Sequence, residues 1–288
     1  MTASRKYIQA LVALKRIADD ISQSLYRPDL RCRPQYYDYV VTTIFAYPEL
    51  PEFLKNAYLW EHDTVHPACF QILDSLWTSK NPYRIAVLCG GSGALSGALR
   101  RHFSSRSLTI DNLDLSKSML DRDGNSDAKI LVDLSLPINL GRTYDCVLCV
   151  GGLRYFSTSL HVFADNIRQL IGKAGTMFIA EVDSGLTQEL CQLLTHDGIV
   201  CHLTKTTLRV FRNTLFYFLL DQYKKNNRFR ELVTSLEEPG MDLCRILIDL
   251  AGYKMTTFHF CTCTTRMCDE GAGTISKGLE EKHSIRAV

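Results

Sequence analysis

Apolar residues along the chain recur with two periods, one helical and one strand-like. Helical spacing predicts helices over residues 2–26, 67–77, 186–198 and 241–250. Apolar or alternating runs predict strands over 84–89, 107–113, 199–203 and 253–263, and the run at 208–220 fits either a strand or a helix. Because strands and helices alternate through the middle of the chain, the pattern indicates an α/β fold.

A glycine cluster lies where the first strand in the middle of the chain gives way to a helix. Its residues are Cys89, Gly90, Gly91, Ser92 and Gly93. Glycines let the backbone adopt a positive φ and let a ligand approach closely. The following helix begins with free N–H groups and a positive partial charge. The next strand leads to Asp114, about 20 residues after Gly93, which is the spacing of one βαβ unit with an acid that can bind a ribose.

These segments and those that follow resemble the class I S-adenosylmethionine-dependent methyltransferases. The resemblance covers roughly residues 70–182 and resumes at 250–253. The matching segments are the glycine loop at 85–93, the ribose strand at 112–120, the third strand at 130–133, the fourth strand and its loop at 144–156, and the helix, turn and fifth strand at 167–181. The 112–120 and 144–156 segments are the specific ones, because a dinucleotide-binding Rossmann domain would match only the first half.

The resemblance implies a doubly wound, mostly parallel Rossmann-like sheet with helices on both faces. It divides the chain into an N-terminal helical, aromatic-rich lid at 1–66, a cofactor-binding domain at 67–266, and a polar tail at 267–288 that we expect to be disordered. An insertion at 184–240 follows strand five, and strand six is expected to start at 250–253. Two roles stay open for residues 1–66: closure over the cofactor, or simple packing of the aromatic side chains against a sheet edge.

The resemblance also implies S-adenosylmethionine as the cofactor, bound at the carboxyl ends of the strands. Asp114 would bind the ribose hydroxyls and Asp133 the adenine amino group. The residues expected around the cofactor are Cys89, Gly90, Gly91, Gly93, Asp114, Leu115, Met119, Asp133, Leu134 and Val150. The chain departs from the family at Val87 and Cys89, where an acid and a glycine are usual, so the way in which the methionine end is held stays open.

Methyl transfer from a sulfonium depends on alignment and exclusion of water more than on covalent help. Arg154 and Tyr155 follow strand four; the arginine could pair with a carboxylate of substrate or cofactor, and the tyrosine ring could face the sulfonium. Glu181 closes strand five and could act as a base or bind an amine. His62, in the expected lid, is the candidate base that titrates near neutrality. A purely structural role stays open for each of these residues.

The function implied is methylation of a small-molecule acceptor, and two alternatives stay open. The family fold also hosts enzymes that transfer or cyclise the aminocarboxypropyl part of the cofactor and release methylthioadenosine. The unusual Val87 and Cys89 motivate that alternative. The other alternative is a non-enzymatic binding protein, against which the acids Asp114 and Asp133 argue.

Composition narrows the partners and the compartment. The chain has 288 residues and a formal net charge of +2, so no strong field would attract nucleic acid. No apolar run reaches the roughly 20 residues that span a bilayer, and residues 1–6 do not lead into a signal-peptide core. We therefore expect a cytosolic protein with no membrane or nucleic-acid partner; the sequence carries no signal for its oligomeric state.

The 11 cysteines are expected to be small buried hydrophobes. Cys146 and Cys149 lie three apart in an expected strand, so they should face opposite sides of the sheet. Cys261 and Cys263 share a strand face, but no second pair with ligand spacing accompanies them. The sequence therefore predicts no metal site.

Overall fold

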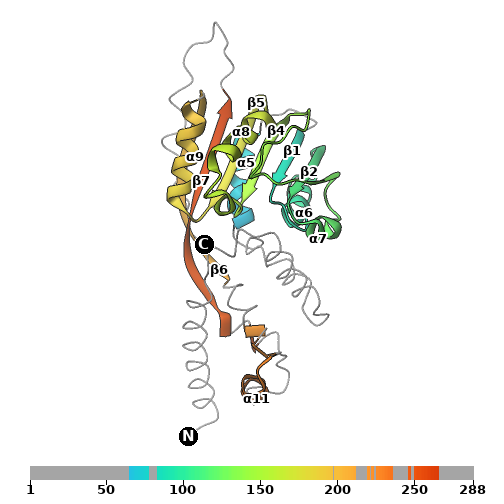
Figure 1. The fold of residues 1–288 in the computed structure, drawn as a ribbon, viewed down its shortest axis with the longest axis vertical. Helices are drawn as coiled ribbons and strands as arrows, with labels where there is room; N and C mark the ends of the chain where they lie inside the picture. Colours follow the sequence, from blue (N-terminus) through green and yellow to red (C-terminus); the bar gives the residue numbers. More distant parts are fainter. Residues whose placement is uncertain are drawn as a thin grey trace.

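The computed structural model describes residues 65–77, 83–196, 198–211, 219–220, 222–223, 225–235, 246–247 and 250–265. Nearly all of the expected lid, including His62, and the expected tail at 267–288 lie outside these residues. The described part holds a sheet and the helices that pack on it (Figure 1).

The strands form one sheet in which most neighbours run parallel. They are β1 (Tyr83–Leu88), β2 (Leu108–Asp114), β3 (Ala128–Leu131), β4 (Tyr144–Val150), β5 (Ile171–Glu181), β6 (Ile199–Phe211) and β7 (Tyr253–Thr265). Their order is β3-β2-β1-β4-β5-β7-β6. Strands β1 to β5 pair in parallel, whereas β7 runs antiparallel to both β5 and β6. The predicted doubly wound, mostly parallel sheet is therefore confirmed.

Helices cover both faces of this sheet. They are α5 (Val65–Leu76), α6 (Ala94–His102), α7 (Lys117–Arg122), the 3-10 helix η2 (Leu153–Phe156), α8 (Leu160–Leu170) and α9 (Ser184–His196). The helix α11 (Asn227–Thr234) lies below the main part of the sheet in Figure 1. Helices α5 and α6 contribute Leu73 and Leu99 to one core cluster, and α8 and α9 contribute Phe163 and Leu190 to another. The predicted helices at 67–77 and 186–198 correspond to α5 and α9.

Strand β4 shows how the two clusters share the sheet. Val147 and Cys149 belong to the cluster of α8 and α9, while Cys146 and Leu148 belong to the cluster of α5 and α6. This alternation follows from the two-residue period of a strand, which points successive side chains to opposite faces. The prediction that Cys146 and Cys149 face opposite sides is confirmed.

The last two strands extend one edge of the sheet. β6 lies within the stretch expected to be an insertion and is itself a sheet strand of 13 residues. It takes up the ambiguous run at 208–220 as far as Phe211, and 212–218 lie outside the described residues. The strand expected at 253–263 is β7, which lies between β5 and β6.

The β6–β7 pair continues past the carboxyl end of β5. Glu181, the last residue of β5, is opposite His259, and residues 253–258 of β7 pair with β6 beyond that point. In Figure 1 this pair runs downward from the rest of the sheet. A two-stranded ribbon therefore borders the end of the sheet where the candidate site lies.

Candidate functional site

The order in which strands are added to the sheet reverses between the parallel strands β1 and β4. From β1 the chain goes to β2 and β3 on one side, and from β4 it goes to β5 on the other. Open α/β sheets bind ligands outside the carboxyl ends of the strands at such a switch point. The loops after β1 and β4 meet there, because a Cβ added to Gly152 would lie 2.8 Å from the Cβ of Cys89.

The loop after β1 has an unusual backbone. Cys89, Gly91 and Gly93 all have a positive φ, of 54°, 55° and 76°. A non-glycine residue in this region costs roughly 1–2 kcal/mol, so the neighbouring contacts must hold Cys89 in place. Its N–H donates to the carbonyl of Leu113 over 2.8 Å, and the Gly93 N–H donates to the carbonyl of Gly90 over 3.0 Å. The expected glycine turn is thus present as a tight turn at the crevice.

Asp114 ties this loop to the end of β2. Its Oδ2 accepts the Gly91 N–H at 2.9 Å, and its Oδ1 accepts the Ser116 N–H at 2.8 Å. The side chain is 5% exposed, and the adjacent Leu115 is 41% exposed. The Asp114 carboxylate, a hydrogen-bond acceptor, is therefore held against the glycine loop at the end of β2. The apolar side chain of Leu115 is exposed beside it.

A polar network beneath the loop was not expected from the sequence. Asn112 Nδ2 donates to the Gly91 carbonyl at 2.9 Å and to Asp123 Oδ2 at 2.7 Å. Asp123 Oδ1 also accepts the Asn125 N–H, and Asn125 Nδ2 donates to the Gly93 carbonyl. In the sequence these residues show only as a polar Asn112 within an apolar strand and as Asp123 and Asn125 just after a short helix. Neither position indicates which groups they contact.

Two glycines of the loop, Gly90 and Gly93, have no room for a side chain. A Cβ at Gly93 would lie 1.9 Å from Asp123 Oδ1, and one at Gly90 would lie 2.3 Å from Asn112 Oδ1. The Ser92 hydroxyl, by contrast, is buried and has no hydrogen-bond partner among the described residues. The loop therefore combines a rigid backbone with one polar atom that a ligand could satisfy.

Asp133 lies two residues past the end of β3, which spans Ala128–Leu131 instead of the expected 130–133. The Val132 N–H donates to the Asp114 carbonyl at 3.0 Å and keeps this segment beside β2. The Asp133 Oδ1 then accepts both the N–H and the hydroxyl of Ser135, at 2.9 and 2.6 Å. Asp133 thus forms a local turn next to Asp114, and its placement at the same sheet end agrees with the expectation.

Three other residues expected near the cofactor lie in the core. Met119, Leu134 and Val150 are all buried. Met119 belongs to α7, Leu134 packs in the cluster of α8 and α9, and Val150 packs in the cluster of α5 and α6.

Arg154 and Glu181 form an ion pair across the ends of β4 and β5. Arg154 Nη2 donates to Glu181 Oε1 at 3.0 Å, and the Arg154 N–H donates to Oε2 at 3.3 Å. The Val182 N–H also donates to Oε1 at 2.8 Å. Glu181 is 0% exposed and the Arg154 side chain is 22% exposed. Arg154 was expected to pair with a carboxylate of the substrate or cofactor. In the structure its partner is Glu181, a carboxylate of the chain itself.

Cys89 lies among these charged groups. A hydrogen bond with Cys149, burial, and the negative charges of Cys149, Asp114 and Glu181 together raise the pKa of the Cys89 thiol well above its usual value. The thiol therefore stays protonated near neutral pH. Tyr155 is partly buried and packs against the cluster of α8 and α9.

One end of the sheet thus collects most of the predicted site residues. Asp114 and Glu181 are the last residues of β2 and β5. The glycine loop follows β1, Asp133 follows β3, and Arg154 follows β4. His62 lies outside the described residues. A separate shallow hollow lined by residues 138–143 with Gln169 and Leu170 lies before β4 and β5, at the opposite end of the sheet.

No model of a protein family matches the chain, and no curated protein matches it. Among solved structures, the chain is similar to the YcgJ protein from Bacillus subtilis, at 10% identity and a TM-score of 0.46, over 70% of this chain and 100% of that one. It is similar to the plantazolicin methyltransferase BpumL, solved with S-adenosylhomocysteine, at 11% identity and a TM-score of 0.43, over 82% and 99% of the two chains.

A third similar structure is the phosphoethanolamine N-methyltransferase 2 of Haemonchus contortus in complex with S-adenosyl-L-methionine. Its identity is 15% and its TM-score 0.45, over 83% of this chain and 60% of that one. Two of these three proteins are named as methyltransferases. Likeness at these identities concerns the fold alone. Within the described residues, no helix has both the length and the apolar character needed to cross a membrane.

Proposed function

We propose that the crevice between β1 and β4 binds S-adenosylmethionine and that the protein transfers its methyl group to a small-molecule acceptor. The observation that carries this proposal is the contact of Asp114 Oδ2 with the Gly91 N–H, at 2.9 Å. It joins an acid at the end of β2 to a turn of positive φ after β1, at the switch point of the sheet. An acid in this position suits the hydroxyls of a ribose.

The residues present suit the parts of this cofactor. A carboxylate oxygen can accept more than one hydrogen bond, so Asp114 can hold the loop and still accept from a ribose hydroxyl. The exposed Leu115 would contact the adenine, and Asp133 would accept from its amino group. The buried Ser92 hydroxyl offers a further polar contact. When bound, the cofactor supplies an activated methyl group on a positively charged sulfur.

Asp114 is the carboxylate of the crevice that suits a positively charged ligand, because Glu181 is paired with Arg154. Asp114 ends β2 and Glu181 ends β5, so both lie at the carboxyl edge of the sheet. Carboxylates stabilise a nearby cation most where water is excluded. Glu181 already accepts from two backbone N–H groups and Arg154, so we assign it to holding the loop after β4 in place instead of removing a proton.

In the aminocarboxypropyl alternative Arg154 could grip the carboxylate of the cofactor. Its Nη2 donates to Glu181, which leaves that alternative without the contact that would support it, so we place methyl transfer first. In the proposed mechanism the chain aligns the acceptor with the methyl group and excludes water. The small-molecule acceptor is proposed from the net charge of +2 and from the β6–β7 ribbon beside the crevice.

The test begins with the binding of S-adenosylmethionine and S-adenosylhomocysteine by calorimetry. Asp114→Asn should weaken binding at least about tenfold, because an acceptor becomes partly a donor in a charge-assisted contact. Asp121→Asn is the matched control, since this acid on the neighbouring helix α7 is exposed and pairs only with Lys117 among the contacts described. Absence of binding by the wild-type chain would reject the proposal.

The reaction is tested with the cofactor alone and then with a metabolite extract. Mass spectrometry should detect S-adenosylhomocysteine that depends on the extract. Methylthioadenosine as the product would establish the aminocarboxypropyl alternative instead. Binding without either product, over a broad range of extracts, would favour the non-enzymatic alternative.

A further inference from the structure

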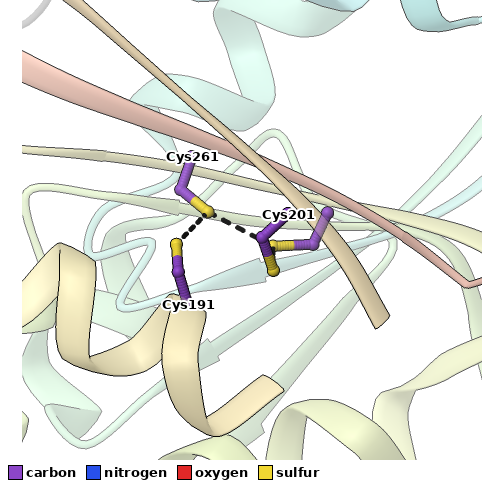
Figure 2. A group of neighbouring side chains, drawn as sticks. Cys191, Cys201 and Cys261 are labelled. Atoms are coloured by element: carbon purple, nitrogen blue, oxygen red, sulfur yellow. Dashed lines mark hydrogen bonds between the residues drawn. The ribbon is translucent and has the colours of Figure 1, made fainter. Parts of the chain in front are cut away.

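Four cysteines from three elements converge on the face of the sheet that α9 covers. They are Cys191 in α9, Cys201 in β6, and Cys261 and Cys263 in β7. Their Sγ atoms all lie within 4.8 Å of one another. The closest pairs are Cys191–Cys261 at 2.7 Å, Cys201–Cys263 at 2.8 Å and Cys261–Cys263 at 3.2 Å. Figure 2 shows the side chains of Cys191, Cys201 and Cys261 directed toward one another.

The fold explains why these side chains meet. Cys201 lies directly opposite Cys263 in the antiparallel pairing of β6 with β7. Cys261 precedes Cys263 by two residues and so shares its face of the sheet. Cys191 lies on the buried side of α9, which packs on this face together with Leu190 and Leu194.

No second cysteine pair with ligand spacing follows Cys261 and Cys263 in the sequence, yet two further cysteines lie beside them in the fold. These are Cys191 and Cys201, one from a helix and one from the following strand. A helix end and a turn lie between them, so their separation along the chain does not match a short ligand motif. Only the folded arrangement shows that the two pairs are neighbours.

We propose that Cys191, Cys201, Cys261 and Cys263 bind one Zn²⁺ ion as four thiolates. Zinc in structural sites takes four ligands in a tetrahedron with Zn–S bonds of about 2.3 Å, which places the sulfurs on the order of 3.8 Å apart. The sulfur atoms here all lie within 4.8 Å of one another, and the three closest pairs, at 2.7, 2.8 and 3.2 Å, would move apart by roughly 0.6–1.1 Å to bind the ion. A set of four thiolates in a tetrahedron is typical of zinc or iron–sulfur sites. A cluster would put its own atoms between the cysteines and hold them further apart, so a single ion fits this spacing.

The surroundings indicate a structural ion. Cys191, Cys261 and Cys263 are buried, and the apolar Leu194 and Ile199 belong to the same core cluster. Four protein ligands leave no open position for a substrate. Cys261 and Cys263 are opposite Ile179 and Met177, which precede Glu181 by two and four residues, or roughly 7 and 13 Å of strand. The ion would join α9 to the β6–β7 edge of the sheet, away from the crevice.

Two disulfides, Cys191–Cys261 and Cys201–Cys263, are the competing arrangement. The closest sulfur pairs would allow them, although 2.7 and 2.8 Å exceed the roughly 2.05 Å of an S–S bond. Two disulfides would use the four cysteines as separate pairs, whereas one ion would use the approach of all four, including Cys261 and Cys263 on their shared strand face. The measurements below distinguish the two arrangements.

The experiment measures metals in the purified full chain by inductively coupled plasma mass spectrometry after gel filtration. We expect close to one zinc per chain. Cys201→Ser, at the least buried of the four positions, should lose most of the zinc. Cys69→Ser is the matched control, because Cys69 is a buried cysteine of α5 in the other core cluster and should leave the zinc unchanged.

A second measurement keeps the test decisive if the variant fails to fold. The wild-type chain is denatured with a chelator and an alkylating reagent, without reductant, and its mass is measured intact. Zinc together with alkylation at all four cysteines supports the site. Disulfides at these cysteines, iron in place of zinc, or four free thiols without metal would each overturn it.

Discussion

At the residue scale, the sequence indicated which side chains gather at the crevice but not what they contact. Asp114 could be placed because an acid at the end of a strand, about 20 residues after a glycine turn, has a defined position in a βαβ unit. The Arg154–Glu181 pair could not, because the two residues are distant in sequence and meet only when β4 and β5 pair. Sequence spacing reports neighbours along an element, and pairing between elements is decided by the sheet.

The ion pair leads to the first prediction, on stability. Arg154→Met leaves Glu181 charged in a fully buried position, and removing one partner of a buried pair costs about 3–5 kcal/mol. The carboxylate keeps the Val182 N–H, so we expect a loss near the lower end, about 3 kcal/mol, in urea unfolding. Glu181→Gln leaves an arginine that can turn toward solvent, so its effect should be smaller.

The double variant Arg154→Met with Glu181→Gln provides the control for this prediction. Because the second change removes the charge that the first leaves unpaired, the double variant should be more stable than Arg154→Met alone. Strictly additive losses would show that the two side chains are not coupled.

Arg154→Lys keeps the charge without the forked donors, and we propose that it lowers turnover about tenfold.

The second prediction concerns the reactivity of Cys89. Because its pKa is raised in the folded chain, this thiol should react with iodoacetamide at pH 8 about tenfold more slowly than in the unfolded chain. The raised pKa favours the folded state at lower pH, and that contribution to stability is lost as the pH rises above the usual thiol pKa. Mass spectrometry of the Cys89 peptide over time gives the rate.

The control removes the main cause of the raised pKa. The hydrogen bond with Cys149 is the largest contribution, so Cys149→Ala should speed the alkylation of Cys89 in the folded chain. An alkylation rate for Cys89 in the wild-type chain equal to that of an exposed cysteine would contradict the proposed environment.

At the scale of elements, the glycine turn was predictable and its support was not. Three positions of positive φ follow β1, as a strand, a glycine cluster and a helix in that order imply. The polar residues that hold the turn come from β2 and from the segment after α7. The sequence does not indicate which groups Asn112 contacts from its buried position in β2, because tertiary packing determines those contacts.

The third prediction tests this support with a pair of glycines. Gly93→Ala adds a Cβ 1.9 Å from Asp123 Oδ1 and also strains a backbone with φ of 76°. Gly141→Ala adds a Cβ with nothing within 4 Å, at a φ of 63°, so it isolates the strain of roughly 1–2 kcal/mol. Unfolding in urea should show a clearly larger loss for Gly93→Ala.

Binding of S-adenosylmethionine separates the two variants further. Gly93→Ala displaces the turn that contacts Asp114, so we expect at least about tenfold weaker binding, or about 1.4 kcal/mol. Gly141→Ala lies before β4 at the opposite end of the sheet and should bind as the wild type does. Equal affinities of the two variants would show that the turn does not form the binding site.

At the scale of the whole molecule, the sequence predicted a mostly parallel sheet and the succession of its first five strands along the chain, whereas it did not predict the edge formed by β6 and β7. The stretch from 184 to 240 looked like an insertion because the sequence resemblance stops at residue 182. The structure uses part of it for α9 and β6, which close one side of the sheet. The cysteine cluster belongs to this edge, so it escaped prediction for the same reason.

The last prediction concerns the independence of the crevice and the cysteine cluster. A ligand at 100 times its Kd stabilises a protein by about 2.7 kcal/mol. For a chain of this size, with roughly 2–4 °C per kcal/mol, saturation with the cofactor should therefore raise the Tm by roughly 5–10 °C. Loss of zinc in Cys201→Ser should lower the Tm of the free protein. Because Cys261 and Cys263 lie opposite residues two and four positions before Glu181, roughly 7 and 13 Å along β5, we expect the two effects to add.

Four melting curves test this independence: wild type and Cys201→Ser, each with and without S-adenosylmethionine. We expect both proteins to show the same cofactor-dependent increase, from different starting temperatures, because the ion would fasten the α9 edge and the cofactor would contact the loops after β1 to β4. Asp114→Asn gives the complementary result, with little increase in Tm on adding cofactor; the Tm of the free variant should lie below that of the wild type, because the amide can accept only one of the two backbone N–H groups that Asp114 accepts. A cofactor response that disappears in Cys201→Ser, while the variant remains folded by circular dichroism, would show instead that the edge of the sheet controls the crevice.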